Sequence, residues 1–176
     1  EKKFRFDYSA FAAPFYFRSS IAKGIIRFKN YGYTELAAAY AQEIAKCVSE
    51  RFDGVTFHCV TYIPITKMRK FKRGYNQSEI LAKAVANQLN VPLEDLLIKA
   101  RNTKSQRNIS ARERRTNLHG AFDLAIGKEA DGKCILIVDD IKTTGSTLSE
   151  CALTLRAYGA KEVYAAAIAV VDENKR

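Results

Sequence analysis

Two adjacent carboxylates and a group of hydroxyl side chains follow an apolar segment in "CILIVDDIKTTGSTL", residues 134–148. Asp139 and Asp140 come directly after the apolar residues, and a hydroxyl-rich segment surrounds Gly145. Its hydroxyl residues are Thr143, Thr144, Ser146 and Thr147. Hydroxyls and backbone N–H groups at the start of a helix bind phosphate, and glycine lets the backbone approach a ligand closely. The pattern therefore predicts a phosphate-binding loop beside two acids.

The two acids would repel a phosphate group, so we expect them to serve another part of the same ligand. A pair of sugar hydroxyls, or a magnesium ion beside them, fits this requirement. The chain contains neither G-x-x-x-x-G-K-[ST] nor G-x-G, which excludes a P-loop ATPase and a Rossmann dinucleotide fingerprint. A polar turn that caps a helix would explain any one of these features, but their combination is far more specific.

These residues need a sheet that presents them at the ends of its strands, where ligands of open α/β sheets bind. Apolar segments at 55–63, 120–126, 134–138 and 163–171 predict strands. Helices are expected at 19–32, 34–52, 76–89 and 147–158, with Ser19 or Ser20 and then Ser78 as caps, although Asn76 and Gln77 are alternative caps. The alternation predicts an α/β fold with a mostly parallel sheet. Residues 1–18, rich in aromatic side chains, are expected to form an N-terminal arm or hood beside one domain over 19–176.

The basic residues are concentrated in two segments. The net charge is +10, which favours an anionic partner such as nucleic acid, a phosphorylated metabolite or an acidic membrane. Residues 67–73 and 99–115 together hold 12 of the 29 lysines and arginines. Both segments are expected to be surface loops, and the long polar segment 101–117 is typical of a flap that closes over a site.

The cysteine and histidine content argues against a zinc cluster. The four cysteines are scattered, no C-x-x-C occurs, and the chain has two histidines. Buried free thiols and a cytoplasmic location are therefore expected, and no apolar run is long enough for membrane insertion. The first residue is Glu1 rather than methionine, which favours a segment of a longer protein.

The strand, acid pair and hydroxyl loop together resemble the phosphoribosyl pyrophosphate (PRPP) signature of type I phosphoribosyltransferases. The resemblance implies a Rossmann-like fold with a mostly parallel central sheet, flanking helices and a small hood. It implies that Asp139 and Asp140 are the catalytic pair and hold the ribose 2′- and 3′-hydroxyls. It also implies that residues 143–147 hold the 5′-phosphate, with Lys142 at the variable position of the motif.

A second resemblance, to the ComF/GntX family of competence proteins, covers roughly residues 20–171. "RGYNQ", residues 73–77, matches one block of that family. Gln106, Arg114, Asn117 and the segment 120–122, "GAF", match another. Many members carry an N-terminal zinc ribbon with four cysteines, and these 176 residues contain no such ribbon. The resemblance implies a role in DNA uptake.

The resemblance also gives the basic segments a role, because PRPP carries a pyrophosphate leaving group. It implies pyrophosphate binding by Thr66, Lys67, Arg69 and Arg73. It implies a flexible flap that excludes water and carries Arg101, Gln106, Arg107 and Arg114. Mg²⁺ is expected with PRPP near the acid pair, bound through the substrate and water rather than through dedicated protein ligands. For any single lysine or arginine, a solvated side chain is the simpler alternative.

Three functions fit these features. The first is transfer of phosphoribose from PRPP to a nitrogen acceptor, and the second is PRPP or nucleotide binding during DNA uptake with little or no turnover. The third is single-stranded DNA binding through the basic segments and aromatics such as Phe71 and Tyr75. The acid pair favours the first two, because DNA binding does not need it. DNA-uptake proteins and a second copy of the chain are compatible partners in each case.

Overall fold

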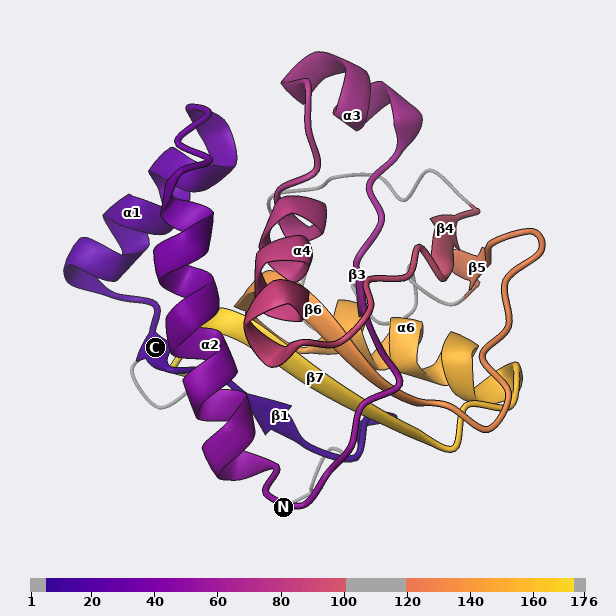
Figure 1. Cartoon of the computed structure of the whole chain (residues 1–176). Coiled ribbons are helices and arrows are strands. Elements are labelled where there is room, and N and C mark those ends of the chain that lie inside the picture. The colour runs from indigo at the N-terminus through magenta and orange to yellow at the C-terminus, as the bar shows by residue number, and fades with distance from the viewer. Residues whose placement is uncertain (1–5, 101–119, 173–176) are drawn as a thin grey trace.

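The computed structural model describes residues 6–100 and 120–172, and a parallel sheet lies at its centre (Figure 1). Within the described residues the sheet has five strands in the order β1-β7-β6-β3, with β2 pairing with β7 after β1. The strands are β1 (Phe11–Ala12), β2 (Phe15–Tyr16), β3 (Cys59–Tyr62), β6 (Cys134–Lys142) and β7 (Glu162–Val170). All of these pairs are parallel, so the carboxyl ends of β3, β6 and β7 meet at one edge. The predicted α/β fold with a mostly parallel central sheet is confirmed.

Helices cover both faces of this sheet (Figure 1). Helices α1 (Ser19–Asn30), α2 (Leu36–Arg51) and α4 (Gln77–Leu89) pack on one face. Helix α6 (Ser146–Ala157) packs on the other, together with the antiparallel pair β4 (Leu97–Lys99) and β5 (Phe122–Leu124). The small antiparallel pair stands at the margin of the main sheet.

Strand β6 is the centre of both cores, because successive side chains of a strand point to opposite faces. Leu136 and Val138 join the core under α1, α2 and α4, and Ile135 and Ile137 join the core under α6. These four side chains are fully buried. Each contributes about 1.5–3 kcal/mol of transfer free energy. The strand that carries the acid pair is therefore fixed from both sides.

The basic segment at 67–73 is a helix, so the expectation of a loop there is wrong. Helix α3 (Lys67–Arg73) begins after the cap residue Thr66 and ends at Gly74, whose φ of 78° is left-handed. No residue of α3 is buried, and in Figure 1 the helix stands away from the sheet. Because none of its faces packs on the core, the sequence has no apolar periodicity there to reveal a helix.

Three other local expectations need correction. Strand β6 extends to Lys142, so both acids lie within its last residues rather than after it. Asn76 caps α4 by accepting a hydrogen bond from the Ser78 backbone N–H, and Ser78 is not the cap. The first helix begins after Arg18, with no side-chain cap from a serine.

The described part of the N-terminal arm pairs with the sheet through β1 and β2, and the domain boundary at residue 18 stays a prediction.

All four cysteines are free; Cys59, Cys134 and Cys151 are buried, whereas Cys47 is partly exposed. Among the described helices, none combines the length and the apolar character needed to cross a bilayer.

Candidate functional site

The acid pair lies at the carboxyl end of the central strand, but its two carboxylates have different surroundings. Asp140 is buried, with 3 % of its surface exposed, and Asp139 is partly exposed. Each carboxylate accepts a hydrogen bond of 2.8 Å from the backbone N–H of the next residue, which fixes both side chains against the strand. The remaining contacts come from helices α1 and α4.

Helix α4 supplies two polar side chains to the pair. The Ser78 hydroxyl donates to Asp139 Oδ1 at 2.9 Å. Gln77 Nε2 donates to Asp140 Oδ2 at 3.4 Å, and the Arg73 guanidinium donates to Gln77 Oε1 at 3.1 Å. The first turn of α4 therefore links the acid pair to the end of the basic helix α3. Of the residues proposed for pyrophosphate, Arg73 alone is connected to the acids by hydrogen bonds, through Gln77, within the described part of the chain.

Lys29 of α1 makes an ion pair with Asp140, with 2.8 Å between Nζ and Oδ2. Neither Lys29 nor Ser78 was proposed as a site residue from the sequence. Lys29 does stand in the last turn of α1, within the part of the chain that resembles the ComF/GntX family. That resemblance was the sequence feature that could have drawn attention to Lys29.

The surroundings of Asp139 alter its acidity. Burial, and then the adjacent carboxylate of Asp140, raise the pKa of Asp139 to about 7. The Lys29 ammonium and the hydrogen bonds from Asp140 N–H and Ser78 oppose this increase. A carboxyl group in this state can change protonation near neutral pH.

The hydroxyl segment forms the turn between β6 and α6. Gly145 is the N-cap of α6 and has φ 74°, a left-handed conformation that favours glycine. The Thr144 and Ser146 hydroxyls lie 2.8 Å apart, and the Ser146 N–H donates to Thr144 Oγ1 at 3.4 Å. No acidic residue occupies the first turn of α6, so its N-terminus keeps its partial positive charge.

A small hollow of about 20 Å³ joins the acid and hydroxyl groups. Its lining residues are Asp139, Ile141, Lys142, Thr143, Gly145, Ser146, Thr147 and Leu148. Asp140 is not among them. This volume suits about one water molecule, so a phosphate group needs the side chains around the hollow to move outward.

The N-terminal arm packs against Gly145, one of the residues that line this hollow. A methyl group placed on Gly145 would lie 2.9 Å from the Phe6 ring and 3.0 Å from the Tyr8 hydroxyl. The Phe6 and Tyr8 rings stack with centroids 4.9 Å apart, and the Lys142 ammonium lies 4.8 Å from the Phe6 centroid. The arm therefore packs directly on the predicted phosphate loop.

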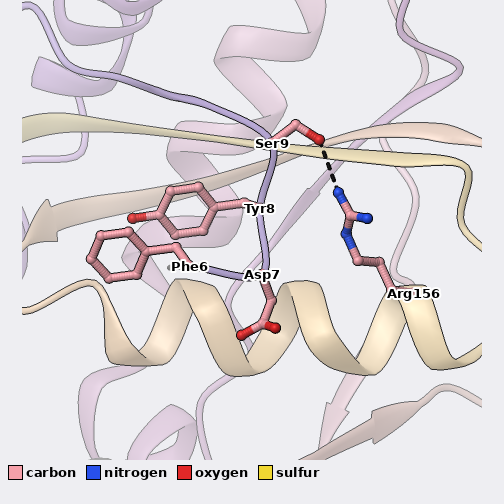
Figure 2. Close-up of a pocket in the computed structure, with 5 residues that line it drawn as sticks. All are labelled: Phe6, Asp7, Tyr8, Ser9 and Arg156. Carbon is pink, nitrogen blue, oxygen red and sulfur yellow. Dashed lines mark hydrogen bonds between the residues drawn. The ribbon is translucent and has the colours of Figure 1, made fainter. Parts of the chain in front are cut away.

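A larger surface pocket of about 600 Å³ lies between this arm and α6, lined by Phe6, Asp7, Tyr8, Ser9 and Arg156 (Figure 2). The Ser149 hydroxyl donates to Asp7 at 2.6 Å, and Arg156 donates to Ser9 at 2.9 Å. The pocket contains neither member of the acid pair and none of the loop hydroxyls. We therefore assign the candidate site to the smaller hollow, where the chemistry is concentrated.

The residues proposed for pyrophosphate follow β3, the neighbour of β6. Thr66 Oγ1 accepts a hydrogen bond from Arg69 N–H at 3.3 Å as the cap of α3, and Lys67 is exposed. Burial, and then the charge of Arg69, lower the pKa of Lys99 in β4. Arg101, Gln106, Arg107 and Arg114 of the predicted flap lie outside the described residues.

The fit of Mg²⁺ can be judged from the donors present. No group of three or more His, Cys, Asp or Glu side chains in the described residues could hold a metal ion by itself. Asp139 lines the hollow, and Asp140 is engaged by Lys29. This donor set fits an ion that arrives bound to the oxygens of a substrate.

Comparison with solved structures supports the predicted fold. The allosteric regulatory enzyme of purine biosynthesis matches with a TM-score of 0.51 and 21% identity, over 80% of this chain and 29% of that chain. An adenine phosphoribosyltransferase matches with a TM-score of 0.51 and 15% identity, over 82% of this chain and 74% of that chain. These likenesses establish the type I phosphoribosyltransferase fold.

Curated relatives are named for competence and DNA utilization. Competence protein F of Haemophilus influenzae is 39% identical over 57% of this chain and 45% of its own length. DNA utilization protein YhgH of Salmonella typhi is 35% identical over 74% of this chain and 58% of its own length. Competence protein ComFC of Bacillus subtilis is 31% identical over 69% of this chain and 48% of its own length. The chain thus spans about half the length of these relatives, and the resemblance to ComF proteins is confirmed.

A family model described as "Phosphoribosyl transferase domain" matches residues 75–176, more than half of the chain. The match begins at Tyr75, one residue before the cap of α4, and includes the acid pair and the hydroxyl loop. The chain belongs to the phosphoribosyl transferase domain family.

Proposed function

We propose that this protein binds PRPP at the acid pair and the hydroxyl loop, and transfers its phosphoribosyl group to a nitrogen nucleophile. One observation carries the proposal: Asp139 shares a single hollow with Gly145, Ser146 and Thr147 at the N-terminus of α6. A carboxylate that accepts from sugar hydroxyls and a helix terminus that donates to a phosphate match the two ends of a ribose 5-phosphate. The family membership supports the same ligand.

In the proposed reaction, the nucleophilic nitrogen forms a bond to C1 of the ribose. The bond between C1 and the pyrophosphate oxygen breaks, and the pyrophosphate leaves with the electron pair. The nitrogen then loses its proton to solvent. Basic groups of α3, including Lys67, Arg69 and Arg73, are suited to stabilise the departing charge. Mg²⁺, when bound with PRPP near Asp139, would offset part of the same charge.

The first test is PRPP binding by calorimetry in the presence of Mg²⁺. We expect saturable binding to the unaltered protein and at least a tenfold weaker affinity for Asp139→Asn. The matched control is Asp53→Asn, which removes an exposed carboxylate just after α2, near the amino-terminal edge of the sheet. Absence of binding at millimolar PRPP, or equal losses in both variants, would contradict the proposed site.

Turnover needs a separate measurement, because binding alone fits a non-catalytic role in DNA uptake. Release of pyrophosphate from PRPP is measured with Mg²⁺ across nucleobases, ammonia and glutamine. Release with one acceptor, lost in Asp139→Asn, would establish transfer. Binding without release for all acceptors would favour the non-catalytic alternative.

A second candidate function is binding of single-stranded DNA, and helix α3 favours it. Phe71 is 91 % exposed in a helix that also carries five basic side chains. Exposed aromatic rings stack on bases, and lysines and arginines neutralise the phosphates between them. The names of the curated relatives refer to competence and DNA utilization. A labelled oligonucleotide should bind with an affinity that falls steeply as salt increases, and salt-independent or absent binding would exclude this function.

A further inference from the structure

The two adjacent acids differ in how completely the protein occupies their oxygens. Asp140 Oδ1 accepts from the Ile141 N–H at 2.8 Å, and Oδ2 faces both the Lys29 ammonium and Gln77 Nε2. Asp139 Oδ1 accepts from the Asp140 N–H and the Ser78 hydroxyl. Among the described residues, no hydrogen bond reaches Asp139 Oδ2. Asp140 is thus satisfied by the protein, and Asp139 keeps one oxygen for a ligand.

The ammonium of Lys29 holds the position that a cation would take beside Asp140. It lies 2.8 Å from Oδ2, and one third of the Lys29 side chain is exposed, with the carboxylate buried. A lysine ammonium is a compact point charge that balances a carboxylate without needing a defined coordination geometry. Mg²⁺, by contrast, needs six oxygen ligands in nearly octahedral geometry and loses its water reluctantly.

We propose that Lys29 is a positioning residue that occupies the cation place at Asp140, so that a divalent metal ion reaches the acid pair only with the substrate. Without Lys29, the Asp140 carboxylate would lie near that of Asp139 without a balancing charge, and the two negative charges would attract a divalent ion directly. With Lys29 in place, the pair offers one open carboxylate oxygen, which suits sugar hydroxyls better than a metal. The sugar-binding part of this role rests on the proposed function.

Tyr75 fixes the end of the helix that carries Lys29. Its hydroxyl donates to the Phe28 carbonyl at 2.8 Å and accepts from the Gly32 N–H at 3.2 Å, so it clamps the last turn of α1. Lys29 follows Phe28, whose side chain is fully buried. Tyr75 also lies directly before the cap of α4, the helix that contacts both acids. The motif at residues 73–77 therefore joins α1 and α4 around the pair.

The test is Mn²⁺ binding in the absence of PRPP. Binding is measured as the decrease in the electron paramagnetic resonance signal of free Mn²⁺. We expect no saturable binding below millimolar Mn²⁺ in the unaltered protein, and at least tenfold tighter binding in Lys29→Met. The matched control is Lys23→Met, which removes an exposed lysine from the same helix and should behave as the unaltered protein. The double variant Lys29→Met with Asp140→Asn should lose the gained affinity, because it removes one of the two carboxylates.

A second variant keeps the test decisive if Lys29→Met does not fold. Tyr75→Phe preserves every charge and removes both hydrogen bonds of the clamp, so we expect Mn²⁺ affinity to increase two- to fivefold. Saturable Mn²⁺ binding to the unaltered protein with the affinity of the variants would overturn the proposal. Unchanged affinity in a folded Lys29→Met, or in Tyr75→Phe when Lys29→Met does not fold, would also overturn it.

The Mn²⁺ measurement contains no PRPP, so its outcome is separate from the proposed function. A protein that gains Mn²⁺ binding in Lys29→Met but does not bind PRPP would refute the PRPP site and leave the role of Lys29 intact. A protein that binds PRPP but shows no change in Mn²⁺ affinity in the folded variants would refute the role of Lys29 and leave the PRPP site intact.

Discussion

The acid pair and helix α3 are both strongly charged, yet the protein surrounds them in opposite ways. Asp139 and Asp140 lie near the carboxyl end of the central strand, where they receive hydrogen bonds from helix α4 and the backbone, and Asp140 also pairs with Lys29 of α1. Helix α3 has no buried residue, and its Phe71 ring is almost fully exposed. The first region has its geometry fixed before any ligand arrives, whereas the second contributes charge and surface with little effect on folding. We therefore expect substitutions near the acid pair to change stability and binding together, and substitutions in α3 to change binding alone.

The largest effect is expected where the hydroxyl loop meets the arm, in Gly145→Ala. The left-handed backbone costs alanine about 1–2 kcal/mol, and the added methyl group meets Phe6, Tyr8 and Lys142 at 3.0 Å or less. Urea denaturation should show a loss of about 2 kcal/mol, and PRPP affinity should fall at least tenfold.

The control for this substitution is Gly127→Ala, where φ is also 74° but no atom of the described residues lies within 4 Å of the added methyl group. It should lose about 1 kcal/mol from backbone strain, with no change in PRPP affinity. If both variants lose the same stability and the same affinity, the packing of the arm on the loop does not matter.

An intermediate effect is expected in the pH dependence of stability. The folded pKa of Asp139, about 7, lies above its unfolded value near 3.8, so the folded state holds its proton more tightly. The unaltered protein should lose stability as the pH rises from about 4 to about 7, and the penalty should remain above that range. Asp139→Asn removes this titration.

Urea denaturation at several pH values measures the difference. Asp139→Asn should be more stable than the unaltered protein at pH 8, by on the order of 1 kcal/mol because Asp139 is partly exposed, and the difference should shrink toward pH 5. A stability difference that stays constant with pH would show that Asp139 does not titrate in this range. The surroundings of the acid pair would then not shift the pKa of Asp139 as described above.

The smallest effect on stability is expected in Phe71→Ala on helix α3. Because 91 % of the Phe71 surface is exposed, the free energy of unfolding should change by less than about 0.5 kcal/mol. Affinity for a single-stranded oligonucleotide should fall by about 1–3 kcal/mol if the ring stacks on a base. Ile126→Ala, which removes another exposed apolar side chain, is the control and should change neither quantity. Equal oligonucleotide affinities for the two variants would remove α3 from the DNA-binding surface.

The sequence predicted the parts of the site that are continuous in the chain. Residues 139–147 form one motif whose strand, turn and helix follow from local patterns, and the structure has that strand, turn and helix. The contacts of Lys29 and Ser78 with the acids could not be predicted, because they join segments far apart in the chain and carry no spacing signal. Helix α3 was missed because no face of it packs on the core. Strand β4 was missed because it is three residues long and pairs only with β5 among the described strands.

The position of β6 between β3 and β7 has a further consequence for the molecule as it fluctuates. Backbone amides at sheet edges open often, whereas those of an inner strand exchange with solvent when the domain opens as a whole. Strands β1 and β2 are two residues long and lie at one side of the sheet, far in pairing order from β3. Fraying of that edge would leave β6 paired with both β3 and β7, so the acids should keep their positions even when β1 and β2 separate from β7.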